Sequence, residues 1–141
     1  MAKSGLPVPD ISSLIIADLV VLDKNTGKRS ILCTFNRVKV SRGFPHSHAS
    51  LSVYWSLSNC RGVHDMTFSI TPPATTDNPA PPQIFNTGGK IDLGNDPLQI
   101  HEMDVKIENL VFPVPGAYMF QVELSIGGDL KSASKMVYFT P

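Results

Sequence analysis

Residues 50–58 read Ser-Leu-Ser-Val-Tyr-Trp-Ser-Leu-Ser, an alternation of small polar and large apolar side chains. Because successive side chains of a strand point to opposite faces of a sheet, this alternation predicts a strand with one buried face. We expect Trp55, the only tryptophan, to pack in the core on that face. The opposite face is neutral and flat, and it is either solvated or an interface, since few charges oppose its burial. Its interface candidates are Ser50, Ser52, Tyr54 and Ser56.

The same period of two recurs along the chain, whereas no stretch of ten residues has a helical period without a breaker. Alternating segments lie at residues 66–70, 103–107 and 118–126, and 12 Pro and 10 Gly separate the apolar runs. Further strands are expected at 14–22, 30–40 and 135–140, with an edge strand near 84–85. We therefore predict an all-β fold without substantial helix, a single antiparallel β-sandwich of immunoglobulin-like type with seven or eight strands. The domain spans residues 14–141 after an N-terminal extension, residues 1–13.

Length and charge narrow the class of protein. The chain has 141 residues, 42% of them hydrophobic, with 12 basic and 12 acidic side chains. This length suits one domain, and zero net charge argues against a generally basic nucleic-acid binder. No secretory signal pattern or apolar run of about 20 residues is seen, so we expect a cytoplasmic protein without a membrane partner. Two free thiols are expected, with Cys33 buried in an apolar run and Cys60 in a turn.

Turn chemistry predicts several local features. Residues 23–27 end in Gly27 and predict the first hairpin, and Gly88-Gly89-Lys90 reads as another hairpin turn, since Ile91 replaces the Ser or Thr of a phosphate-binding loop. A bulge is expected near Asn36, because Phe35 and Val38 differ in parity. Tyr118 follows a Pro-Gly turn, as does the tyrosine that pins a corner in many sandwiches.

Several segments together carry a family pattern: residues 26–32, 35–38, Phe44-Pro45, His48 and residues 109–120. In this order they resemble a bacterial family of small β-sandwich proteins classed as a domain of unknown function. One departure is Asn36, which stands where the family usually has an aspartate. The resemblance implies the fold, a bacterial or phage-related origin and a structural corner at His48, where we expect the imidazole to bond the loop backbone. It implies no activity.

Candidate metal ligands occur as two pairs: His46 with His48, and Cys60 with His64. Their spacing matches no zinc signature, and a strand over about 49–58 would hold the pairs at opposite ends. We therefore predict no metal site and no cofactor, and keep a metal- or ligand-binding protein as the alternative. No Gly-x-Ser-x-Gly elbow or catalytic cysteine context is present. No catalytic residue is predicted, and the protein is not expected to be an enzyme.

The neutral total charge hides two blocks of opposite sign. Residues 92–108 carry a net charge of −4 and residues 24–42 carry +6. The two segments either pair in the fold or form separate poles that bind partners. The basic hairpin also offers a weak nucleic-acid contact as a third function. Its basic residues are Lys24, Lys28, Arg29, Arg37, Lys39 and Arg42.

Together these features favour a non-catalytic protein-interaction or accessory module that is capable of self-association. A protein partner is expected, and nucleic acid is disfavoured as the main ligand.

Overall fold

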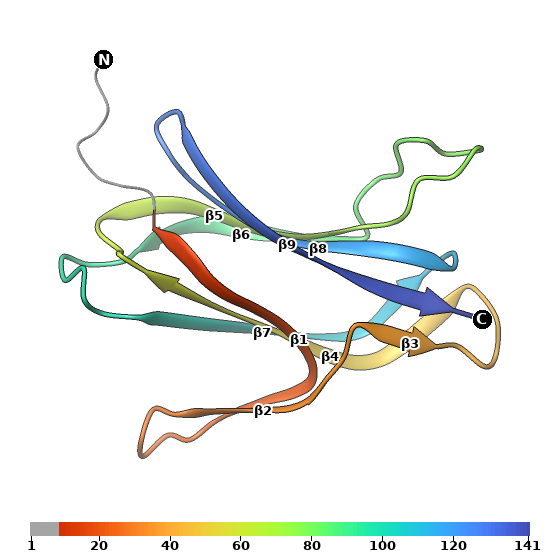
Figure 1. Cartoon of the computed structure of the whole chain (residues 1–141), viewed down its shortest axis with the longest axis horizontal. Coiled ribbons are helices and arrows are strands. Elements are labelled where there is room, and N and C mark those ends of the chain that lie inside the picture. The colour runs from red at the N-terminus through yellow and green to blue at the C-terminus, as the bar shows by residue number, and fades with distance from the viewer. Residues whose placement is uncertain (1–8) are drawn as a thin grey trace.

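The computed structural model describes residues 9–141, and these residues form strands and loops without a helix (Figure 1). No helix in this part of the chain is therefore long and apolar enough to span a membrane. The first strand begins at Asp10, four residues before the predicted domain start, and residues 1–8 of the predicted extension lie outside the described residues. The nine strands are β1 (Asp10–Leu22), β2 (Arg29–Thr34), β3 (Arg37–Lys39), β4 (His46–Ser58), β5 (Val63–Thr71), β6 (Phe85–Asp92), β7 (His101–Phe112), β8 (Gly116–Ile126) and β9 (Asp129–Thr140).

The strands form two sheets that pack as a sandwich. The four-stranded sheet has the order β2-β1-β4-β7, and the five-stranded sheet has the order β3-β9-β8-β5-β6. Every pairing is antiparallel except that of β3 with β9. The all-β sandwich predicted from sequence is confirmed, whereas an immunoglobulin-like topology is not. The expected edge strand near residues 84–85 is β6, at the margin of the five-stranded sheet.

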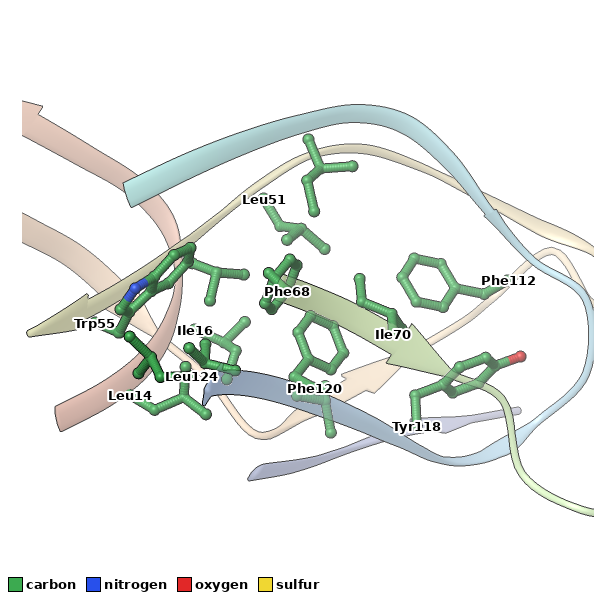
Figure 2. Packing of buried hydrophobic residues seen from close by; sticks show 14 of the residues in the cluster. Leu14, Ile16, Leu51, Trp55, Phe68, Ile70, Phe112, Tyr118, Phe120 and Leu124 are labelled. Carbon is green, nitrogen blue, oxygen red and sulfur yellow. The ribbon is translucent and has the colours of Figure 1, made fainter. Parts of the chain in front are cut away.

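The core lies between the inward faces that the alternation predicted (Figure 2). Trp55 of β4 is 4% exposed and stacks on Phe68 of β5, with ring centroids 5.6 Å apart. Toward the other end of the sandwich, Phe112 stacks on Phe139 at 4.0 Å, and the Tyr118 ring meets Phe112 edge-on at 5.0 Å. Burial of these aromatic rings removes large apolar surfaces from water and so stabilises both ends of the core.

The segment 33–40 differs from the bulged strand that was predicted. The chain leaves the four-stranded sheet after Thr34 and enters the five-stranded sheet at Arg37, so a change of sheet takes the place of a bulge. This change explains how Phe35 and Val38 both pack against the core despite their parity. The predicted burial of the thiols is also wrong, because Cys33, within β2 and with φ of 59°, is exposed, whereas Cys60, in the β4–β5 loop, is buried. Both are free, as expected.

The hairpin turn predicted at the glycine pair, Gly88 and Gly89, is also wrong. Both residues lie inside β6 and not in a hairpin turn. A Cβ on Gly88 would come within 2.6 Å of the Met66 carbonyl oxygen, so the glycine permits close approach of β5. The turn at residues 23–27 is confirmed, since the amide of Gly27 donates to the Asp23 carbonyl at 2.8 Å and its φ is 73°.

Candidate functional site

The serine face of β4 is buried by the chain itself. Ser52, Tyr54 and Ser56 are only 2%, 8% and 5% exposed, and Ser50 is half-buried. These positions therefore form neither the solvated face nor the exposed interface that the sequence pattern suggested. The cause is the β1–β2 hairpin, which curves back over this face.

An ion-pair network holds the hairpin in this position. Arg29 of β2 lies 3.5 Å from the carboxylate of Glu102 and 3.5 Å from that of Asp104, both on β7. Two strands separate β2 from β7 in the sheet, about 14 Å, so the guanidinium reaches β7 only because the hairpin folds back (Figure 1). Beneath it, the Tyr54 hydroxyl donates to Glu102 Oε2 at 2.5 Å. Burial first, and then this bond, raise the pKa of Tyr54.

The basic block of residues 24–42 is divided by the fold. Lys24 and Lys28 lie at the tip of the β1–β2 hairpin, whereas Arg37 and Lys39 lie on β3 at the opposite end of the molecule (Figure 1). Arg42 lies just after β3, in the loop between β3 and β4. Among the described residues, the ion pairs between the basic and acidic blocks all involve Arg29, and the six basic residues do not form one patch.

The candidate metal ligands are separated as the strand length predicted. His46 and His48 begin β4, whereas Cys60 lies beyond its end and His64 lies on β5. His64 is buried, and its Nε2 is 2.6 Å from the Arg61 carbonyl oxygen. In the part of the chain that the structure describes, no group of three or more His, Cys, Asp or Glu could hold a metal ion.

His46 and His48 form a pair that the sequence analysis assigned differently. His46 Nε2 lies 3.1 Å from His48 Nδ1, so the contact seen for His48 is with a second imidazole rather than with the loop backbone. Both rings pack against Phe139, with centroids 6.0 Å away in each case. Burial, and then the neighbouring His46, lower the pKa of His48, while Asp18 raises it.

These histidines face the core because the inward parity changes along β4 and β7. Residues 103, 105 and 107 of β7 point inward, and after Asn109, with φ of 56°, Leu110 and Phe112 do. His48 and His46 pair with these two residues and turn inward with them. Strict alternation would have turned Ser47 and Ala49 inward instead. An asparagine that tolerates positive φ is the only sequence signal for this change.

Tyr118 fulfils its predicted role at the corner between β7 and β8. Its hydroxyl donates to the Val114 carbonyl at 2.6 Å and accepts from the Val114 amide at 3.1 Å. The residue is fully buried, and burial raises the pKa of its phenol. Figure 2 shows the hydroxyl at the end of the aromatic cluster, pointing toward this turn.

An exposed surface that the sequence analysis did not single out lies on the outer face of the five-stranded sheet. We call it the outer patch. Tyr138 and Met136 of β9 are 45% and 41% exposed, whereas Val137 and Phe139 between and beyond them are fully buried. The strand register sets Arg37 of β3 beside Tyr138 and Met119 of β8 beside Met136. The outer patch consists of Arg37, Met119, Met136 and Tyr138.

Comparison with known proteins adds a family but no activity. No curated protein matches the chain. Among solved structures, a beta-glucuronidase from Parabacteroides merdae is similar at 13% identity and a TM-score of 0.42. That similarity covers 93% of this chain and 14% of the glucuronidase chain, a level at which it supports no functional argument. Residues 12–137 match the model of a family of unknown function, DUF6941, and the chain therefore belongs to this family.

Proposed function

We propose that the protein is a non-catalytic interaction module in which the outer face of the five-stranded sheet, including the outer patch, binds the same face of a second copy. The observation that supports the proposal most is that the chain covers the outer face of the four-stranded sheet and leaves the outer patch of the five-stranded sheet exposed. The β1–β2 hairpin lies over the outside of the four-stranded sheet, whereas Tyr138 and Met136 remain exposed on the outside of the other. Tyr, Met and Arg are the residue types enriched at protein interfaces, and the outer patch combines all three.

The surroundings of the outer patch favour burial. Ser134 of β9 lies beside Gln121 of β8, so two neutral side chains adjoin the outer patch. Neutral side chains cost less to desolvate than charged ones. The only acidic residue of β8 on this face is Glu123, opposite Ser132.

Charge complementarity within this face favours a second copy as the partner. Arg37 lies beside Tyr138, and Glu123 lies two strands away beside Ser132. A two-fold axis in the plane of the interface, passing over β9 midway between them, brings each Arg37 onto the Glu123 of the other copy. Such reciprocity, in which residue i meets j and j meets i, is the rule for symmetric dimers.

The size of the face indicates a weak complex. Four strands at about 4.8 Å spacing with a shared length of about seven residues, together with the three residues of β3, give roughly 490 Å² for each copy. The total of roughly 1,000 Å² is at the low end for specific interfaces, where association is transient. We expect dissociation constants in the range of tens to hundreds of micromolar.

Sedimentation velocity from about 10 µM to about 1 mM protein tests the proposal. The wild type should shift from monomer toward dimer, and Arg37→Glu should remain monomeric because two acidic groups then face each other. The double variant Arg37→Glu with Glu123→Arg should restore dimerisation, since the charges are exchanged. Leu98→Glu, on an 87% exposed side chain in the β6–β7 loop, is the control and should dimerise normally. A wild type that stays monomeric, or a charge exchange that restores nothing, would overturn the proposal.

A further inference from the structure

The loop between β3 and β4 encloses a hollow that the interaction role does not use. Its volume is ≈ 360 Å³, and its lining includes Lys39, Ser41, Arg42, His46 and Ser47. This size falls in the range of small-molecule sites and exceeds what an inorganic ion needs. The lining therefore determines which class of small molecule fits.

Positive charge in this hollow is not balanced by the protein. Lys39 and Arg42 both line it, and no carboxylate does. Within residues 9–141, no ion pair holds either cation. Arg29 differs from these two cations, because it lies between two carboxylates. Two cations left without a counter-charge match an anion that carries nearly two negative charges.

Neutral donors complete the lining. The hydroxyls of Ser41 and Ser47 are available to donate to oxygen atoms. His46 also lines the hollow, and its Nε2 is held by the contact with His48 Nδ1. A phosphate monoester offers three strong acceptor oxygens and a charge of −1.5 to −2 near neutral pH.

The loop is fixed at both ends, so the hollow does not depend on ligand binding for its shape. The amide of Val40 donates to the Thr140 carbonyl at 2.7 Å, and the Val40 side chain is 4% exposed. At the other end Phe44 packs against the core. Preformed sites pay less ordering entropy on binding. We propose that this hollow binds the phosphate group of a small phosphate monoester, with Lys39 and Arg42 as the charged contacts.

Titration of the ¹⁵N-labelled protein with ribose 5-phosphate, inorganic phosphate and acetate tests the assignment. Ribose 5-phosphate should give saturable amide shifts at residues 39–47, and inorganic phosphate should compete with it. Arg42→Gln and Lys39→Gln should each weaken this binding at least tenfold. Lys28→Gln, an exposed cation at the far hairpin tip, should leave it unchanged. Amide resonances elsewhere report whether each variant remains folded.

Three results would overturn the proposal: no saturable shift with ribose 5-phosphate, acetate binding as tightly as phosphate, or equal weakening by Lys28→Gln. Binding is measured on dilute monomer, so failure of self-association leaves this test intact.

Discussion

Removing one oxygen atom from Tyr118 tests whether the corner between β7 and β8 is held by hydrogen bonds. Tyr118→Phe keeps the ring, which meets Phe112 at 5.0 Å and Phe139 at 5.3 Å, both edge-on. It deletes only the hydroxyl, which donates to the Val114 carbonyl and accepts from its amide. The change in stability therefore reports these two bonds and little of the packing.

The size of the effect follows from the two bonds. Each contributes about 1 kcal/mol net to folding, so the loss is about 2 kcal/mol. Val114 is half-buried, so water replaces part of the lost hydrogen bonding. About 2 kcal/mol is therefore an upper value for the loss of stability. At about 2.1 cal/mol/K per residue, a chain of this length unfolds with an entropy of roughly 0.3 kcal/mol/K. The expected fall in Tm is then about 7 °C.

Urea and thermal unfolding, followed by the fluorescence of the buried Trp55, measure the difference. The matched control is Tyr138→Phe, at a tyrosine that is 45% exposed and whose hydroxyl makes no hydrogen bond within the described residues. We expect the control to remain within about 0.5 kcal/mol of the wild type. If both variants lose the same stability, or neither loses any, the corner is held by packing alone and not by the two hydrogen bonds.

Two further changes test other features. Gly88→Ala should lower the free energy of unfolding by about 1–3 kcal/mol, because the new Cβ would meet the Met66 carbonyl oxygen and Thr67 Cγ2 at 2.6 Å. Gly89→Ala, with nothing within 4 Å, should be neutral or slightly stabilising in the same urea titration. Burial lowers the pKa of His48, so the unfolded chain takes up this proton first, and stability should fall as the pH drops below about 6.5. His48→Gln should show a smaller loss between pH 7.5 and 5.5, and equal losses would contradict this assignment.

Alternation predicted the strands whose two faces differ in polarity. Trp55, Phe68 and Phe120 point into the core as the period of two requires. The pattern failed where the backbone leaves regular geometry. Cys33 and Asn109 both have positive φ, and each marks a position where the chain changes sheet or the inward parity changes. A cysteine gives no signal for such a backbone, and an asparagine gives only a weak one.

The site was harder to predict than the fold, because it depends on which faces the chain covers. The neutral composition of the serine face of β4 predicted a low cost of burial, and Ser52, Tyr54 and Ser56 are indeed buried. The face is buried, but the β1–β2 hairpin covers it. Nothing in residues 23–29 indicates that the hairpin bends back, because the bend is held by the long-range contacts of Arg29 with Glu102 and Asp104.

The two charge blocks show the same dependence on long-range structure. Their segments were expected either to pair or to form separate poles, and the fold does both, because Arg29 is neutralised while Arg37, Lys39 and Arg42 remain at the other end. The ion pairs of Arg29 hold the β1–β2 hairpin over the outer face of the four-stranded sheet. The cations that remain lie beside the outer patch and the hollow of the β3–β4 loop. Several faces of this sandwich have a low desolvation cost, so topology and unpaired charge determine which of them stay accessible to solvent.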